Sequence, residues 1–267
     1  MNQPLSYVHP QARIAENTVI EPFSVIHKNV EVDEGTWIGS NVTIMSGARI
    51  GKNCKIFPGT VISAVPQDLK FAGEDTIVRI GDNNVIRECV TINRGTRASN
   101  ETVIGNNNLI MAYVHIAHDC VVGDNCIIAN AVSLAGHIDI DDYAIVGGMS
   151  AVHQFVRIGK HSMISGGSLV RKDVPPYVKA AREPLSYVGV NSIGLRRRGF
   201  SSEQIAEIQE IYRVMYMRNK NVSQAMRIIE AELRATAERD EILSFINNSK
   251  RGIMKGYTRN QQNGNAY

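Results

Sequence analysis

A small group of residues between positions 115 and 154 has the chemistry of an acid–base site: His115, His118, Asp119, Gly136, His137 and Gln154. Histidine is the side chain most easily poised near neutral pH, so it is the natural general base. A neighbouring carboxylate fixes which ring nitrogen carries the proton, and a glycine N–H can face a developing oxyanion. These residue types indicate general-base catalysis with oxyanion stabilisation, if the fold brings them together.

The spacing of these residues is regular. His118, Gly136 and Gln154 are 18 positions apart, and so are Asp119 and His137. His115 lies three residues before His118. If the chain repeats its path every 18 residues, His118, Gly136 and Gln154 stack in one column. Asp119 and His137 then stack in the column beside it.

A period of six runs through most of the chain. Of the 28 sixth positions from Val8 to Val170, 25 hold Ile, Val or Leu, and Asp68, Glu74 and Ala98 are the exceptions. Neither a helix nor a flat strand has this period, which is typical of a solenoid. Three hexads would make one triangular coil of about 18 residues, and coils would stack at roughly 4.8 Å.

The interrupted positions predict loops near 63–79 and 93–103, so we expect a parallel β-helix over residues 1–181. The remainder, 182–267, has helical spacing. A capping box, Ser201 to Gln204, opens one helix, and further helices are expected to open at Asn221 and Asp240. A polar, disordered tail is predicted from about residue 259.

Composition limits the function classes. The net charge of +3 is too small to indicate a nucleic-acid partner. No apolar run approaches the length of a membrane span, so no membrane insertion is expected. The opening MNQPLSYVHPQ lacks a signal-peptide pattern, so we expect a cytoplasmic protein.

A metal site is the rival interpretation of the histidines. His115, His118 and His137 could supply the three nitrogen ligands that catalytic zinc requires. Hexapeptide-repeat carbonic anhydrases bind zinc in this way, between chains. The segment from Gln67 to Glu74 and the helical region have no use in such an enzyme, which argues against this interpretation.

Several segments resemble one family closely. The pattern [Ile/Val/Leu]-[Gly/Asp/Asn]-x-x-small-x is similar to the hexapeptide-repeat acyltransferases, whose prism is a left-handed parallel β-helix. Within them the chain resembles the UDP-N-acetylglucosamine O-acyltransferases that begin lipid A synthesis. The resemblance covers residues 5 to about 255 and is carried by QDLKFAGE (67–74), IRECVTINRGT (86–96), HIAHDC (115–120), LAGH (134–137), GGMSAVHQF (147–155), DVPPYV (173–178), GVN (189–191) and GLRRRGF (194–200).

The resemblance implies transfer of a 3-hydroxyacyl chain from acyl carrier protein to the 3-hydroxyl of UDP-N-acetylglucosamine, without cofactor or metal, at the seam between subunits of a homotrimer. It implies that His118 is the general base, that Asp119 orients it, and that the Gly136 N–H polarises the thioester carbonyl. It implies substrate contacts for Asp68, Lys70, His115, His137, His153, Gln154, Asn191 and Arg197.

Three positions bear on substrate choice. Gly166 falls where the family measures the acyl chain, and its lack of a side chain predicts that C14 or longer chains are accepted. Asn93 stands where the family commonly has His, and Ile193 where it often has Glu near the nucleotide. These departures leave open a 3-amino acceptor instead of the 3-hydroxyl. A third class of function is a non-catalytic scaffold that uses the prism as a spacer. In that case replacing His118 with alanine would change no measurable property.

Overall fold

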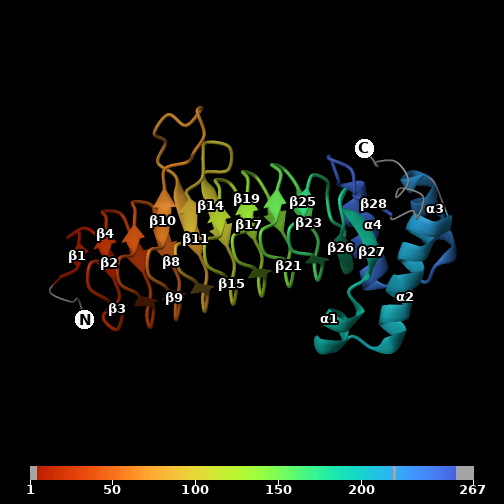
Figure 1. Cartoon of the computed structure of the whole chain (residues 1–267), viewed down its shortest axis with the longest axis horizontal. Helices are drawn as coiled ribbons and strands as arrows, with labels where there is room; N and C mark the ends of the chain where they lie inside the picture. The colour runs from red at the N-terminus through yellow and green to blue at the C-terminus, as the bar shows by residue number, and fades with distance from the viewer. Residues whose placement is uncertain (1–4, 219–220, 257–267) are drawn as a thin grey trace, which may run out of the picture.

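The chain folds into a three-sided prism with a helical region at its C-terminal end (Figure 1). The computed structural model describes residues 5–218 and 221–256. Two loops stand out from one side of the prism, and the helices lie at the end opposite the N-terminus.

Three sheets form the faces of the prism, and their strands pair in parallel except for β26 with β27 in face 3. Face 1 contains β1 (Tyr7–Val8), β4 (Val25–Ile26), β7 (Thr43–Ile44), β10 (Val61–Ala64), β13 (Thr91–Asn93), β16 (His115–Ile116), β19 (Ser133–Leu134), β22 (Ala151–Val152) and β25 (Leu169–Val170). Face 2 contains β2 (Arg13–Ile14), β5 (Glu31–Val32), β8 (Ala48–Ile50), β11 (Ile77–Ile80), β14 (Glu101–Ile104), β17 (Val121–Val122), β20 (Asp139–Ile140) and β23 (Arg157–Ile158). Face 3 contains β3 (Val19–Ile20), β6 (Trp37–Ile38), β9 (Lys55–Ile56), β12 (Val85–Ile86), β15 (Leu109–Ile110), β18 (Ile127–Ile128), β21 (Ile145–Val146), β24 (Met163–Ile164), β26 (Val178–Ala181), β27 (Ser186–Val190) and β28 (Lys255–Gly256).

The register of neighbouring strands confirms the 18-residue repeat. Ile116 pairs with Leu134, and Leu134 pairs with Val152, in adjacent coils. From β3 to β25, the Ile, Val or Leu that ends each strand of two residues points inward and is almost fully buried, because successive side chains of a strand point to opposite faces. One stacked row of aliphatic side chains per face therefore makes the core, as the period of six predicts.

Three corners join the faces. The first corner, between faces 1 and 2, contains residues 117–120, 135–138 and 153–156. The second corner, between faces 2 and 3, contains 123–126, 141–144 and 159–162, and the third, between faces 3 and 1, contains 111–114, 129–132, 147–150 and 165–168. The loops at 65–76 and 94–100 both follow face 1 strands, so both leave the prism at the first corner.

The C-terminal part begins as a continuation of face 3. Strands β26 and β27 pair as an antiparallel hairpin, and the predicted boundary after residue 181 lies within it. The helices are α1 (Ser192–Arg197), α2 (Ser202–Arg213) with the π-helical turn η1 (Val214–Arg218), α3 (Val222–Glu232) and α4 (Ala237–Asn247).

The helix starts follow their capping residues. Ser201 and Gln204 form the predicted capping box of α2, and Asn221 caps α3. The predicted opening of the last helix at Asp240 is wrong, because the Thr236 side chain accepts a hydrogen bond from the Arg239 N–H and starts α4 at Ala237. The predicted tail from residue 259 lies outside the described residues.

The stacked core predicts a specific stability cost. Replacing Ile128, whose side chain is fully buried, with alanine should lower the free energy of unfolding by roughly 2–5 kcal/mol, because it leaves a cavity in the row. Denaturant unfolding measures this. Val121→Ala is the control, since Val121 is 42% exposed on the outside of the neighbouring face. Equal losses for the two variants would show that the row is not the core.

Among the described helices, none is both long and apolar enough to cross a membrane.

Candidate active site

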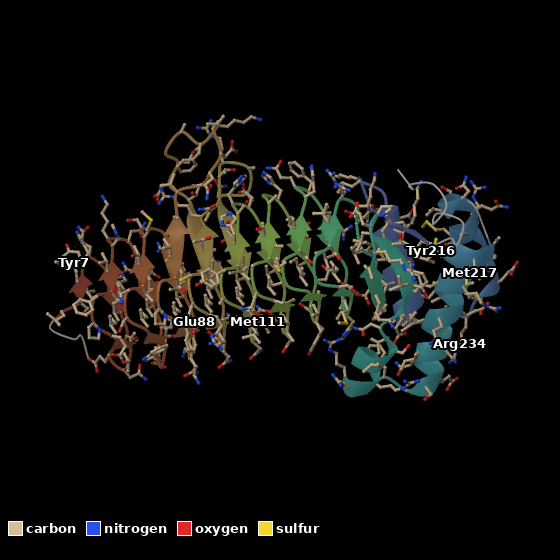
Figure 2. The ribbon with its side chains drawn as sticks, viewed as in Figure 1. Tyr7, Glu88, Met111, Tyr216, Met217 and Arg234 are labelled. Carbon is tan, nitrogen blue, oxygen red and sulfur yellow. The ribbon has the colours of Figure 1, made fainter. Side chains whose placement is uncertain are left out.

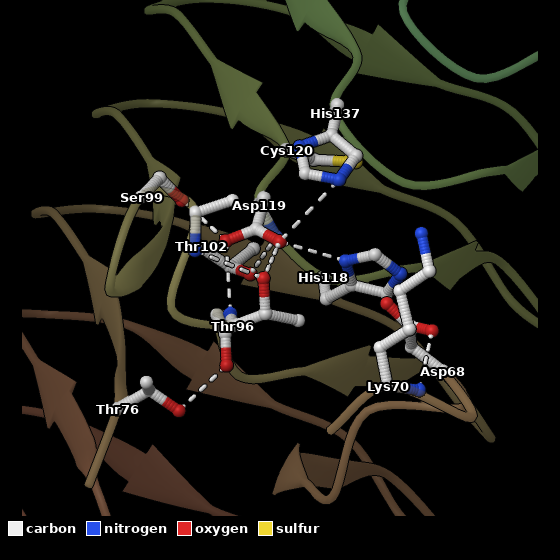
Figure 3. A network of polar contacts seen from close by, with 12 residues as sticks. Asp68, Lys70, Thr76, Thr96, Ser99, Thr102, His118, Asp119, Cys120 and His137 are labelled. Carbon is white, nitrogen blue, oxygen red and sulfur yellow. Dashed lines mark hydrogen bonds and ion pairs between the residues drawn. The ribbon is translucent and has the colours of Figure 1, made fainter. Parts of the chain in front are cut away.

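His118 and Asp119 form a buried pair at the first corner (Figure 3). His118 Nδ1 lies 2.7 Å from Asp119 Oδ2, and the two side chains are 6% and 0% exposed. Asp119 adopts a φ of 60°, in the left-handed region that Asp, Asn and His tolerate better than most residues. The tight corner therefore turns the carboxylate back toward the histidine that precedes it.

The loop at 94–100 surrounds the Asp119 carboxylate with donors. The Thr96 N–H donates to Oδ1 at 2.9 Å, the Thr96 hydroxyl donates to Oδ2 at 2.6 Å, and the Ser99 hydroxyl donates to Oδ1. The Thr102 hydroxyl accepts from the Asp119 backbone N–H at 2.9 Å. Sequence reasoning missed Thr96, Ser99 and Thr102, although the interruption at Ala98 had marked a loop there.

These donors determine the charge of Asp119. Burial, the largest influence, would raise its pKa, but the hydrogen bonds from the loop and from His118 outweigh it and lower the pKa to about 2. An ionised carboxylate can only accept hydrogen bonds. We therefore assign the proton of the His118 imidazole to Nδ1, which leaves a lone pair on Nε2. No hydrogen-bond partner for Nε2 lies among the described residues.

Gly136 lies directly over the histidine ring. A Cβ built on Gly136 would be 2.6 Å from His118 Cε1, so only glycine leaves space for the imidazole. In the described residues the Gly136 N–H has no hydrogen-bond acceptor. An unpaired backbone donor beside a base is the arrangement that an oxyanion site requires.

His137 lies in the next coil, beside Asp119. Its Nε2 is 3.7 Å from Asp119 Oδ2, its ring meets that of His118 edge-on with centroids 5.1 Å apart, and it stacks on Phe155 at 4.6 Å. Two cavities meet at this histidine. His137 therefore connects the two spaces from which ligands can approach the pair.

The first cavity, of about 350 Å³, lies under the loop at 65–76. Its lining includes Asp68, Lys70, Arg97 and His137. Figure 3 shows Asp68 and Lys70 beside His118, on the side away from Asp119. The Asp68 carboxylate accepts a hydrogen bond from the Lys70 N–H at 3.0 Å, which holds the turn of the loop. A lysine there can meet an anionic ligand as it approaches the base.

The second cavity, of about 760 Å³, extends from the buried pair toward the C-terminal region. Asp119, His137 and Phe155 line one end, and Lys250 and Arg251 line the other. The two cavities are lined by groups of both charges: carboxylates, such as Asp139 and Asp173 in the second cavity, accompany the cationic residues on both sides of His137.

Three other predicted residues lie near the pair. His115 is on face 1, where its Nδ1 lies 2.8 Å from the Thr91 hydroxyl. Burial, and after it the charge of His118, lowers the pKa of His115. His153 and Gln154 are exposed in the next coil of the first corner, with His153 Nδ1 3.2 Å from the Gln154 carbonyl oxygen.

The remaining predicted residues lie elsewhere in the single chain. Gly166 is exposed on the third corner, where a Cβ would be 3.0 Å from the Gly148 carbonyl oxygen. Asn191 is buried beside the second corner, where its amide donates to the His161 carbonyl oxygen at 3.0 Å and its Oδ1 caps α1. Arg197 is exposed in the last turn of α1.

The two departures from the family pattern also differ in environment. Asn93 is buried, and its amide donates to the Val65 carbonyl oxygen at 3.1 Å, at the base of the loop that carries Lys70. Its Oδ1 has no partner among the described residues. Ile193 is 63% exposed in α1.

Within one chain, His115, His118 and His137 do not come together as a zinc site. Among the described residues, the group of possible ligands within 4.8 Å of one another is His118, Asp119 and His137, without His115. A carboxylate has about four lone-pair positions, and those of Asp119 accept from Thr96 twice, from Ser99 and from His118. Metal binding there would have to displace hydrogen bonds that the fold already makes.

Comparisons with known proteins agree on one family. Two family models match: "Udp N-acetylglucosamine O-acyltransferase; Domain 2" over residues 173–254, and the six-repeat bacterial transferase hexapeptide over 29–64 and 101–136. The chain is 54% identical over 253 residues to an acyl-[acyl-carrier-protein]–UDP-N-acetylglucosamine O-acyltransferase of Trichlorobacter lovleyi, covering 93% of this chain and 97% of that protein. It is 56% identical to the protein of the same name from Sulfurihydrogenibium, covering 94% and 93% of the two chains.

A solved structure agrees with the sequence matches. A UDP-N-acetylglucosamine acyltransferase from Bacteroides fragilis superposes with a TM-score of 0.94 at 51% identity, covering 96% of this chain and all of that one. The predicted left-handed parallel β-helix with a helical C-terminal region is confirmed. The chain belongs to the acyl-[acyl-carrier-protein]–UDP-N-acetylglucosamine O-acyltransferase family.

Proposed function

We propose that this protein transfers a 3-hydroxyacyl chain from acyl carrier protein to the 3-hydroxyl of UDP-N-acetylglucosamine, the first step of lipid A synthesis, with His118 as general base. The observation that carries the proposal is the 2.7 Å contact between His118 Nδ1 and a carboxylate that can only accept. Because this contact assigns the ring proton to Nδ1, Nε2 is left basic on the side where Lys70 lies. The names and high identity of the relatives support the substrate pair.

The chemistry proceeds by direct attack. As the sugar hydroxyl oxygen bonds to the thioester carbon, its proton passes to His118 Nε2. The carbonyl oxygen becomes an oxyanion that the Gly136 N–H can stabilise. When the carbon–sulfur bond breaks, the proton on His118 passes to the departing thiolate, which leaves as the thiol of the carrier's prosthetic group. Asp119 remains ionised throughout and stabilises the imidazolium.

Both cavities are lined by carboxylates as well as by cations, and the cations are the groups proposed to meet the anionic parts of the substrates. UDP-N-acetylglucosamine carries a pyrophosphate, and Lys70 and Arg97 line the cavity nearer the base. The second cavity ends at Lys250 and Arg251, which suit an acidic carrier protein or its phosphate-bearing arm. His153 and Gln154 are proposed to line the cleft between the sugar and the acyl chain.

A homotrimer would complete the site. The residues carried over from the family lie on three different corners of one chain, so Gly166, Asn191 and Arg197 reach His118 only if a second copy supplies them. Exposed apolar side chains at the third corner support such a contact: Tyr113 is 67% exposed and Met149 78% exposed. Figure 2 labels Glu88 and Met111 along this same corner. The trimer and a cytoplasmic location remain predictions.

The acceptor carrying a 3-amino group is the second candidate, favoured by Asn93. This amide anchors the base of the loop that carries Lys70, at a position where the family commonly has an ionisable histidine. The initial rates of acyl transfer to UDP-N-acetylglucosamine and to its 3-amino analogue, measured side by side with one acyl carrier protein substrate, distinguish the two. We expect faster transfer to the hydroxyl acceptor. Transfer to the amine alone would support the second candidate.

Gly166 gives a prediction about the acyl chain. Gly166→Met should lower kcat/KM for a C14 donor by roughly 10- to 100-fold relative to a C10 donor, because each lost methylene contact is worth about 0.8 kcal/mol. The C10 donor is the internal control for folding and for the chemical step. Unchanged chain preference in this variant would show that Gly166 does not face the acyl chain.

A further inference from the structure

The loop at 94–100 supplies three of the four hydrogen bonds that the described residues make to the Asp119 side chain. Within it, the Thr96 N–H, the Thr96 hydroxyl and the Ser99 hydroxyl all reach the carboxylate. In the three coils that follow, face 1 and face 2 are joined by corners of four residues (117–120, 135–138 and 153–156), so the seven residues from 94 to 100 make a longer connection than those corners need. Its position at the first corner puts it over the base.

The loop is itself held in one conformation. The Thr76 hydroxyl donates to the Gly95 carbonyl oxygen at 2.6 Å, and the Asn100 N–H donates to the Thr96 carbonyl oxygen at 2.7 Å. The Ala98 N–H donates to the Thr96 hydroxyl oxygen at 3.2 Å, which leaves the hydroxyl proton free to point at Asp119. Donors preorganised in this way do not have to reorient when charge changes beside them.

The Ser99 proton has two possible acceptors, and the carboxylate is the better one. Ser99 Oγ is 2.9 Å from the Glu101 carbonyl oxygen and closer still to Asp119 Oδ1. A hydroxyl has one proton, and hydrogen bonds to charged acceptors are about twice as strong as bonds to neutral ones. Asp119 is ionised and its side chain is fully buried, so the Ser99 proton goes to Asp119.

We propose that Thr96 and Ser99 are positioning residues for the catalytic base: their three donors hold Asp119 as an acceptor-only carboxylate and thereby limit how strongly it attracts the His118 proton. This inference rests on the proposed function. Neither residue touches the reacting atoms, and both act through Asp119. The donors spread the charge of the carboxylate, so Asp119 does not take the Nδ1 proton when His118 becomes an imidazolium.

The direction of the expected shift in the pH profile follows from the negative charge of Asp119. Removing a donor concentrates negative charge on Asp119, which stabilises protonated His118 more strongly and makes the neutral base scarcer at low pH. The acid limb of the kcat/KM profile should therefore move to higher pH. The other groups that face His118 stay in place, namely His115, His137, Lys70 and Asp68, and so does the nearby pair of Glu74 and Arg97.

The test is the pH profile of acyl transfer for Ser99→Ala, Thr96→Val and the double variant. Each single variant should move the midpoint of the acid limb upward by about half a pH unit and the double variant by about one unit, while the high-pH plateau falls by less than about threefold. Ser99→Thr and Thr96→Ser restore the hydroxyls and should restore the wild-type limb.

Thr102→Val is the matched control. Thr102 lies close to the same carboxylate group, but its hydroxyl accepts from the Asp119 backbone and donates nothing to the side chain. The acid limb of the kcat/KM profile of Thr102→Val should stay at the wild-type pH even if this variant is less stable. A uniform loss of activity at every pH in Ser99→Ala and Thr96→Val, or an equal shift in Thr102→Val, would overturn the proposal and leave the loop a purely structural role.

A second measurement separates this inference from the proposed function. Titration of histidine labelled with ¹³C, followed by NMR without substrates, reports the protonation of His118 directly. An upward shift in Ser99→Ala but not in Thr102→Val supports the positioning role even if no acyl transfer occurs. Superimposable His118 titrations in wild type and the double variant would contradict it.

Discussion

Replacing His118 with alanine should lower kcat/KM for acyl transfer by about 10²- to 10⁴-fold, the usual contribution of a positioned general base. The sugar hydroxyl would then lose its proton to water instead of to Nε2. The remaining activity would come from substrate binding and from the Gly136 N–H. Initial rates at saturating and subsaturating UDP-N-acetylglucosamine should show the loss mainly in kcat, because the base acts in the transition state.

The fold should survive this change at a modest cost. The six-residue repeat predicts that the side chain at position 118 points outward from the prism. In the structure His118 is nevertheless buried, with only 5% of the residue exposed. Its removal deletes one hydrogen bond to a charged group, worth about 1.5–3 kcal/mol, while Asp119 keeps the donors of Thr96 and Ser99. Thermal unfolding of the variant checks this. An inactive variant that is unfolded would say nothing of catalysis, and a folded variant with wild-type rates would refute the role of His118.

Replacing Gly136 with alanine is expected to have the second largest effect. The new methyl group would lie 2.6 Å from His118 Cε1 and 2.9 Å from Nε2, so the ring must move. Movement breaks the 2.7 Å contact with Asp119 and displaces the base from the substrate hydroxyl. A misplacement of about 1 Å costs on the order of 10²-fold in rate, so we expect a loss of at least that size.

Gly39→Ala is the control for this variant. Gly39 lies in a corner near the N-terminal end of the prism, and a Cβ there would lie 2.9 Å from Trp37 Cη2, so a ring must also move but no proposed substrate contact is nearby. The rate of Gly39→Ala should stay within a few-fold of wild type. If the two variants lose activity equally, the damage comes from the backbone of the prism and not from contact with His118.

The parts of the site that lie on the repeat were predictable from sequence. The side chains of residues 18 apart share a corner because every coil follows the same path, and this placed Gly136 over His118 and His137 beside Asp119. The same arithmetic separates Gly166 from His118, since their difference of 48 is not a multiple of 18. Regular geometry therefore predicts both which residues meet in one chain and which do not.

The parts that lie off the repeat were not predictable. Thr96 and Ser99 belong to a loop whose path depends on bonds such as that from Thr76 to Gly95, and no periodicity describes it. The start of α4 at Ala237 depended on Thr236, a capping residue without the Glu or Gln three positions later that marked α2. The positions of residues in the coils follow from the 18-residue repeat, whereas the paths of loops and the starts of helices depend on individual hydrogen bonds.

The most direct test of the account is the product formed by the wild-type protein from 3-hydroxyacyl carrier protein and UDP-N-acetylglucosamine. Mass spectrometry and NMR of the purified nucleotide sugar identify the new bond. We expect one 3-hydroxyacyl ester at the sugar O3, formed together with one free carrier thiol and without an added metal or cofactor. Absence of any acylated UDP-N-acetylglucosamine, with a carrier substrate that a related enzyme does use, would contradict it.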